Sequence, residues 1–216
     1  MRSCHDIMLS GKHENGVYQI LNGAKNILHV YCDFGSEPGA AWTLVQSYSL
    51  EKCRNGRDTD MFSTKSLQDD YAVNGNWSSY RLSKVNMQTV REHSTQWRAT
   101  CEFPTTGIEF RDYFRASLSN YDPLYPSTER SLSCKLYEFI NIRGNQYINC
   151  TAATVVDPST VPYLINTKTD VRRDLDLQPN GGTNGENNFG FYQVINSAFR
   201  CSATSTSTTQ YWFGKM

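Results

Sequence analysis

The chain of 216 residues carries 21 basic and 21 acidic side chains, so its formal net charge is zero. This balance argues against nucleic acids and anionic membranes as partners, because both attract proteins with an excess of Lys and Arg. The 13 tyrosines and the 38% share of apolar residues favour β structure over a helical bundle. No apolar run approaches the roughly 18 residues of a transmembrane helix, so we expect no membrane insertion.

Residues 1–50 are predicted to form a compact β unit. Segments 16–21 and 27–32 have the composition of strands, and the Asn-Gly pair at 22–23 is a strong signal for a hairpin turn between them. A third strand is predicted at 41–45, after a break rich in Gly and Pro.

One helix is predicted at 83–93. Ser83 can cap the start of this helix through its side-chain oxygen. Leu82, Val85 and Val90 are predicted to lie along its apolar side.

A half-buried strand is predicted after the helix, because Trp97, Ala99, Cys101 and Phe103 alternate with polar residues. A second hairpin is predicted over 134–151, with strands at 135–142 and 146–151 that reverse at Gly144-Asn145.

Two polar segments, 51–75 and 168–188, are predicted to be loops. The second is rich in Gly and Asn, and long loops in compact domains are often functional. The remaining predictions are a strand at 189–195, a Ser/Thr run at 202–209 and an aromatic strand at 211–213.

No internal repeat or interdomain linker is visible, so we predict one domain over 1–216. It comprises an N-terminal β subdomain (1–50) and a central sheet with a C-terminal loop region (51–216). The predicted fold class is α+β, dominated by antiparallel sheet with few short helices and long loops.

The cysteines indicate an oxidising compartment. None forms a Cys-x-x-Cys pair, and the histidines stand at no zinc-like spacing from them. Widely spaced cysteines of this kind are typical of secreted, disulfide-bonded proteins, and the alternative is a set of free cytosolic thiols. Because their number is odd, three disulfides would leave one thiol, either buried or available to a second chain. They are Cys4, Cys32, Cys53, Cys101, Cys134, Cys150 and Cys201.

Two glycosylation sequons agree with secretion, at Asn76-Trp77-Ser78 and at Asn149-Cys150-Thr151. The sequence begins without the apolar segment of a signal peptide. We interpret it as a secreted, extracellular glycoprotein chain that has been trimmed at both ends.

Four motifs follow one another in the first fifty residues: Ser3-Cys4-His5-Asp6-Ile7, Gly16-Val17-Tyr18-Gln19-Ile20, Val30-Tyr31-Cys32-Asp33-Phe34 and Ala41-Trp42-Thr43-Leu44-Val45-Gln46. They resemble the start of fibrinogen C-terminal-like domains, where a Cys precedes Gly-x-Tyr, Tyr-Cys-Asp and Gly-Gly-Trp-Thr strands. Here Ala40-Ala41 replaces the paired glycines. Cys53, and Gly75-Asn76-Trp77 with Tyr80, are similar to the intelectin branch of the superfamily; beyond Tyr80 the likeness fades.

The resemblance implies a fibrinogen-like fold of a divergent type found in invertebrate extracellular and matrix proteins. It also implies disulfide pairs. Cys4 and Cys32 match the first disulfide of the family, and by analogy with intelectins Cys53 would bond Cys201. Cys134 and Cys150 could then staple the second hairpin, which would leave Cys101 as the odd thiol.

Calcium is the one cofactor that the sequence suggests, because Asp174, Asp176 and Glu186 place hard oxygen donors on the loop at 168–188. Fibrinogen-like domains use a calcium site in this part of the chain, although the calcium-site string of the family is absent here. The spacing does not fit an EF-hand, and a solvated loop without metal is the alternative.

Three late aromatic residues, Tyr192, Tyr211 and Trp212, are candidate ligand-binding residues that could stack on a sugar face. The alternative is that these rings belong to the core. No motif of a hydrolase, kinase or metalloprotease is present, so we predict that the chain is not an enzyme.

These observations leave two hypotheses for the function. The first is a secreted, lectin-like recognition module that binds glycans or an extracellular protein. The second is a structural extracellular-matrix glycoprotein without a small-molecule ligand, in which an unpaired cysteine would link chains into disulfide-bonded oligomers.

Overall fold

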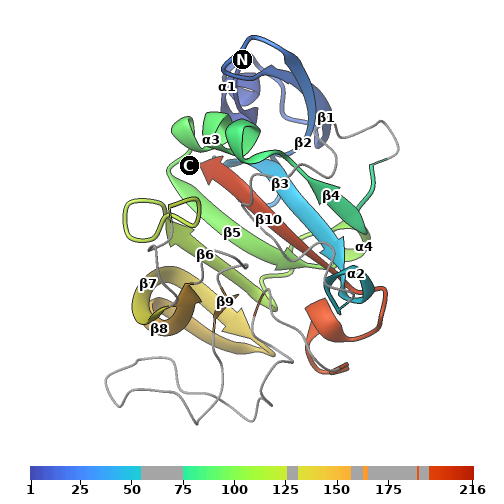
Figure 1. Cartoon of the computed structure of the whole chain (residues 1–216), viewed down its shortest axis with the longest axis vertical. Coiled ribbons are helices and arrows are strands. Elements are labelled where there is room, and N and C mark those ends of the chain that lie inside the picture. Colours follow the sequence, from blue (N-terminus) through green and yellow to red (C-terminus); the bar gives the residue numbers. More distant parts are fainter. Residues whose placement is uncertain (55–74, 126–130, 157–162, 165–188, 190–194) are drawn as a thin grey trace.

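A computed structural model describes residues 1–54, 75–125, 131–156, 163–164, 189 and 195–216. Within these residues, ten strands form one sheet in the order β1-β2-β3-β10-β5-β6-β7-β8-β9, with β4 paired to β3 (Figure 1). Every pair of neighbours in this sheet is antiparallel. The described chain is therefore an α+β fold of mostly antiparallel sheet with few short helices, as predicted.

The N-terminal unit and the hairpin of β7 and β8 lie at opposite ends of the molecule, with β3, β10, β5 and β6 between them (Figure 1). The strands are β1 (Gly16–Leu21), β2 (Ile27–Asp33), β3 (Ala41–Ser49), β4 (Ser79–Arg81), β5 (Gln96–Cys101), β6 (Tyr113–Ser117), β7 (Ser131–Ile142), β8 (Asn145–Val156), β9 (Tyr163–Leu164) and β10 (Thr208–Lys215). The helices are α1 (Cys4–Leu9), α2 (Leu50–Arg54), α3 (Lys84–Glu92), α4 (Phe103–Thr106) and the 3-10 helix η1 (Arg200–Ser202).

The first hairpin confirms the prediction from local sequence. Strands β1 and β2 pair from Gly16 with Cys32 to Leu21 with Ile27. In the connection, the side-chain oxygen of Asn22 accepts a hydrogen bond from the backbone N–H of Asn26 at 2.8 Å. Such an Asx contact is a local reason for the chain to reverse at this point.

The last strand, β10, lies between β3 and β5 in the centre of the sheet (Figure 1). Every residue of β3 is buried, and so is every residue of β10 except Lys215. The close approach of the two strands depends on Gly214, because a Cβ added there would lie 2.3 Å from a ring atom of Trp42. The predicted aromatic strand is therefore longer than expected and is the central strand of the core.

Strand β5 corrects the prediction of a half-buried strand. All of its residues except Gln96 are buried, including the polar residues Arg98 and Thr100. A polar side chain is tolerated inside a protein when it is hydrogen-bonded or ion-paired, and both of these are. The alternation of polar and apolar residues was therefore a misleading signal here.

Helix α3 confirms the predicted helix and its cap, since the Ser83 hydroxyl accepts a hydrogen bond from the N–H of Asn86 at 3.3 Å. Met87 and Val90 are fully buried, but Val85 is 65% exposed. The prediction for Val85 was wrong because that position lies on the side of the helix opposite to Met87 and Val90.

The second hairpin is longer than predicted, because β7 and β8 pair from Ser131 with Val156 to Ile142 with Asn145. The chain reverses at Arg143-Gly144, both with positive φ, and not at Gly144-Asn145. The start of the segment 51–75, which was predicted to be a loop, belongs instead to helix α2. Residues 55–74, the loop at 168–188 and most of the strand at 189–195 lie outside the described residues.

The single domain over 1–216, divided at residue 50, stays a prediction, although the described sheet contains strands from both predicted parts. Among the described helices, none has the length and apolar character needed to cross a lipid bilayer.

Candidate functional site

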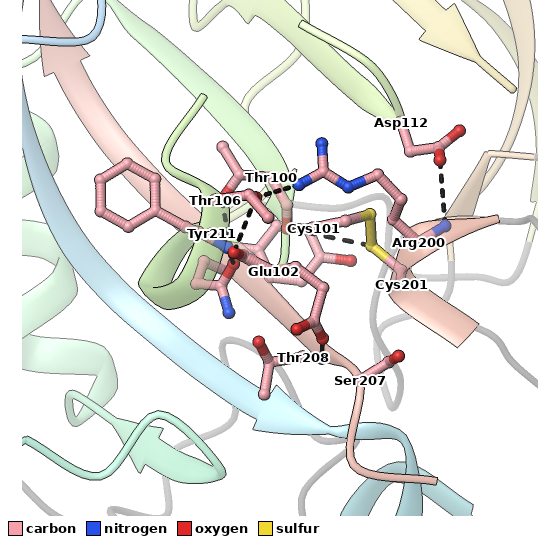
Figure 2. The surroundings of a disulfide bond; sticks show 12 residues. Thr100, Cys101, Glu102, Thr106, Asp112, Arg200, Cys201, Ser207, Thr208 and Tyr211 are labelled. Atoms are coloured by element: carbon pink, nitrogen blue, oxygen red, sulfur yellow. Dashed lines mark hydrogen bonds between the residues drawn. A yellow bond between two sulfur atoms is a disulfide. The ribbon is translucent and has the colours of Figure 1, made fainter. Parts of the chain in front are cut away.

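A shallow surface hollow lies beside the disulfide Cys101–Cys201. Figure 2 shows this disulfide, which joins the end of β5 to η1. The two cysteines are 100 residues apart in sequence, so the bond closes a large loop. The hollow is open to solvent and encloses no internal cavity. It is lined by Thr100, Cys101, Gly107, Ile108, Glu109, Phe110, Arg111, Asp112, Tyr113 and Arg200.

The backbone around the hollow adopts left-handed conformations at residues other than glycine. The φ angles of Glu102, Phe110 and Asp112 are 57°, 52° and 52°. Each costs about 1–2 kcal/mol for a residue with a Cβ, and such residues cluster at functional sites. Surrounding contacts must therefore hold this segment in place.

Glu102 is held by the first residue of β10. Its backbone N–H donates to the carbonyl oxygen of Thr208 at 2.9 Å, and its Oε1 accepts from the N–H of Thr208 at 2.5 Å. Figure 2 shows the side chain of Glu102 pointing toward Thr208, below the disulfide. The turn from β5 into α4 is thus fixed to the central strand.

Asp112 fixes the other side of the hollow. Its buried carboxylate accepts hydrogen bonds from the backbone N–H of Arg143 at 2.6 Å and from that of Arg200 at 3.0 Å (Figure 2). Burial raises the pKa of Asp112, against the opposing effect of these bonds and of the Arg111 and Arg200 charges. Asp112 therefore joins the segment before β6, the turn between β7 and β8, and η1.

The rim of the hollow is aromatic and basic. The guanidinium of Arg200 donates to Glu109 Oε2 at 3.1 Å and to the hydroxyl of Thr106. The ring of Phe110 is 38% exposed, and Arg111 is exposed as well. This rim presents two cations and one ring around a weakly held surface carboxylate.

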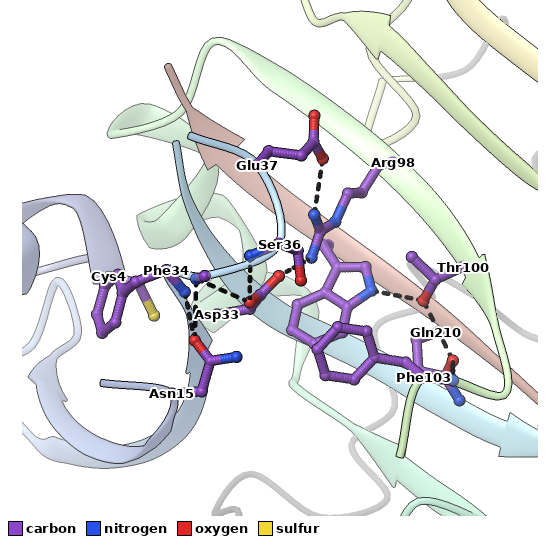
Figure 3. A network of polar contacts seen from close by, with 12 residues as sticks. Cys4, Asn15, Asp33, Phe34, Ser36, Glu37, Arg98, Thr100, Phe103 and Gln210 are labelled. Atoms are coloured by element: carbon purple, nitrogen blue, oxygen red, sulfur yellow. Dashed lines mark hydrogen bonds and ion pairs between the residues drawn. The ribbon is translucent and has the colours of Figure 1, made fainter. Parts of the chain in front are cut away.

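A buried ion network fastens the N-terminal unit to the sheet (Figure 3). Arg98 donates to Asp33 Oδ2 at 2.5 Å and to Glu37 Oε1 at 2.7 Å. Its guanidinium carbon also lies 4.4 Å and 4.9 Å from the ring centroids of Trp42 and Trp212. The cation is thus enclosed by two carboxylates and two indole rings.

Tyr113 connects this network to the hollow that it lines. Its hydroxyl donates to Glu37 Oε1 at 2.8 Å, and burial raises its pKa well above the ordinary value, so it stays a protonated donor. Arg115 pairs with the other oxygen of Glu37 and, at 2.8 Å, with Glu138 on β7. The wall of the hollow is therefore a rigid part of the sheet.

Two predicted ligand-binding residues are corrected by their burial. Tyr211 is 1% exposed and Trp212 is 0% exposed, so neither ring can stack on a sugar at the surface. The indole N–H of Trp212 donates to the hydroxyl of Thr100 at 2.9 Å, and its ring packs against Phe103. These rings belong to the core, and the third candidate, Tyr192, lies outside the described residues.

The disulfides confirm one predicted pair and correct two. Cys4 and Cys32 are bonded as the resemblance implied. Cys201 bonds Cys101 and not Cys53, because η1 lies against the end of β5. Cys134 and Cys150 form no disulfide with each other, since Cys134 pairs in register with Ala153 and Cys150 with Tyr137. Cys134, not Cys101, is an exposed free thiol.

Both sequon asparagines are exposed. The side-chain oxygen of Asn76 accepts hydrogen bonds from the N–H groups of Ser78 and Ser79, each at 3.1 Å, in a surface turn. Asn149 lies within β8 with a φ of 49°. Glycosylation of either residue stays a prediction.

The candidate calcium ligands Asp174, Asp176 and Glu186 lie outside the described residues. Within the described residues, no three His, Cys, Asp or Glu side chains are grouped closely enough to hold a metal ion.

Sequence reasoning missed the residues of the rim, because no motif marks Phe110, Arg111 or Arg200. The only available signal was the group of charges and aromatic rings in the short segment 102–113, which follows a cysteine and contains Pro104 and Gly107.

One family model matches the chain, that of the fibrinogen beta and gamma chains, C-terminal globular domain, over residues 1–64. This stretch contains all four motifs from which the resemblance was inferred. No curated protein matches the chain. The intelectin-like details stay predictions. Residues 1–64 are therefore similar to the C-terminal globular domain of fibrinogen chains, and the antiparallel α+β fold is consistent with this similarity.

Proposed function

We propose that this chain is a secreted, fibrinogen-like recognition module that binds a glycan or a protein partner in the extracellular space. We propose a binding role without catalysis, in which the surface around the hollow meets the partner. Fibrinogen-like domains commonly bind such partners, and those with disulfides are typical of extracellular proteins.

The observation that carries the proposal is the disulfide Cys101–Cys201 at the edge of the hollow. Stable disulfides persist in oxidising compartments, and a second one, Cys4–Cys32, lies in the N-terminal unit. The strained, well-anchored backbone at Phe110 and Asp112 adds support, because such strain is typical of binding sites.

Secretion is tested by expressing the chain behind a secretory leader in animal cells and mapping its peptides without reduction. We expect linked peptides for Cys4 with Cys32 and for Cys101 with Cys201. If all cysteines of a soluble, folded product are thiols, the extracellular part of the proposal is wrong.

Binding is tested on arrays of glycans and of extracellular proteins. A ligand that binds the wild type and is lost in Phe110→Ser would place recognition at the rim. The matched control is Val85→Ser, which changes an exposed apolar residue on α3 instead. If no ligand on either array binds, the recognition module is contradicted.

A structural matrix glycoprotein is the second candidate, and the exposed thiol of Cys134 favours it. In that case the secreted protein runs as a disulfide-linked oligomer on a non-reducing gel, and Cys134→Ser converts it to monomer. A wild-type protein that runs as a monomer contradicts this alternative.

The calcium site that we propose consists of Asp174, Asp176 and Glu186. If these residues bind the ion, adding calcium raises the melting temperature of the wild type and has no effect on a variant in which all three are changed to amides.

A further inference from the structure

The rim of the hollow combines an exposed aromatic ring with two cations. Phe110 is held outward by its left-handed backbone while its ring packs edge-on against Tyr113 and Phe139, with centroids 5.3 Å and 6.1 Å away. A bulky residue with this backbone is unfavourable unless neighbours enforce it. The fold therefore holds one large apolar side chain rigidly at the surface.

The two cations beside Phe110, Arg111 and Arg200, differ in the hydrogen bonds and ion pairs that they form. Arg111 is exposed and donates no hydrogen bond to any residue that the structure describes, although its charge acts on the buried Asp112. Arg200, whose side chain is 17% exposed, is held by Glu109, whose side chain is 58% exposed. Because Glu109 is the solvent-facing partner of this pair, an incoming carboxylate can take its place on Arg200.

The size of the hollow decides between classes of ligand. It is open to solvent and encloses no space for even a water-sized molecule, whereas pockets that enclose small molecules have volumes of roughly 300–1,000 Å³. An exposed ring and arginines on a shallow, rigid surface are instead the composition of protein–protein contacts.

From these observations, and resting on the proposed function, we propose that the surface formed by Phe110, Arg111 and Arg200 docks an acidic segment of a protein partner. One carboxylate of the partner replaces Glu109 on Arg200, a second pairs with Arg111, and an apolar side chain between them packs on Phe110. Glu109 acts as an internal competitor for this segment.

The test uses two fluorescein-labelled peptides that differ only in charge, one alternating Leu with Glu and the other alternating Leu with Lys. Fluorescence anisotropy on the full, disulfide-bonded chain should show binding of the Glu peptide and not of the Lys peptide. We expect Arg111→Ala to weaken this binding about fivefold to tenfold, because it removes one contact without disturbing a hydrogen bond in the described chain. Added salt should also weaken it.

Two variants separate docking from a general effect of charge. Lys12→Ala removes one exposed positive charge from the N-terminal unit and should leave the affinity unchanged. Glu109→Gln removes the internal competitor and should strengthen binding by up to about fivefold. Equal effects of Lys12→Ala and Arg111→Ala, or weaker binding in Glu109→Gln, would overturn the proposal.

A sulfated oligosaccharide serves as the third probe. If it binds in a manner that requires Arg111 and Arg200 while the Glu peptide does not bind, the rim recognises a glycan and the acidic-peptide proposal is wrong. If an array ligand binds wild type and Arg111→Ala equally, the recognition function stands and only this assignment of the rim fails.

Discussion

Replacing Arg98 with Met tests how the N-terminal unit is fastened to the sheet. The side chain of Arg98 is 0% exposed and pairs with Asp33 and Glu37. Met preserves much of the volume, so the main change is the loss of a buried positive charge. Asp33 would then keep only its hydrogen bonds from the backbone N–H groups of Gly35 and Ser36.

The expected cost follows from this uncompensated charge. Removing one partner of a buried ion pair destabilises a protein by about 3–5 kcal/mol. In a domain of this size each kcal/mol lowers the melting temperature by about 2–4 °C, so the expected decrease for Arg98→Met is about 6–20 °C. The matched control is Arg91→Met, which breaks the partly exposed pair with Asp122 and should cost less than about 1 kcal/mol.

The assay is urea unfolding of the oxidised protein, followed by tryptophan fluorescence. The double variant Arg98→Met with Asp33→Asn should be less destabilised than the sum of its single changes, because both remove the same pair. Additive costs, or an Arg98→Met protein within about 1 kcal/mol of wild type, would refute the reasoning.

Three further changes test other parts of the fold. Cys101→Ser should lower the free energy of unfolding by about 4–5 kcal/mol, because it opens a loop spanning 100 residues; equal stability of oxidised and reduced wild type in denaturant would contradict this. Gly214→Ala should cost at least about 1–3 kcal/mol, since the new Cβ would overlap the ring of Trp42, and a thermal melt matching wild type would show that the strands can separate. Burial raises the pKa of Asp112, so its contribution to stability is fully present below the unfolded-state pKa of about 3.9 and is lost as pH rises through the folded-state value. Asp112→Asn should therefore remove a decrease in stability that wild type shows above about pH 4, and parallel pH profiles of the two proteins would count against this role.

Local sequence determines the parts of the fold that were predicted. The hairpin of β1 and β2, the Ser83 cap and the Cys4–Cys32 bond all depend on residues close together in the chain or on motifs of the family. These features need only a turn, a helix cap and a short closed loop. Each of them can form before the sheet is complete.

The candidate site depends on contacts between distant segments, which explains why it was not predicted. The Cys101–Cys201 bond joins the end of β5 to η1, 100 residues later in the chain. Late aromatic residues such as Tyr211 and Trp212 occur both in core strands and at sugar-binding surfaces, so residue type alone does not distinguish the two. Nothing in the sequence distinguishes Phe110 as a left-handed residue, since a bulky side chain is unfavourable in that conformation.

The position of β10 in the middle of the sheet has a consequence for how the chain folds during synthesis. Until residues 208–215 leave the ribosome, β3 and β5 have no partner on the edges that later face each other. Unpaired edges are prone to aggregation, and pairing of strands so distant in sequence is slow. We therefore expect the nascent chain to remain incompletely folded and dependent on chaperones until its final strand arrives, whatever the local stability of the N-terminal unit.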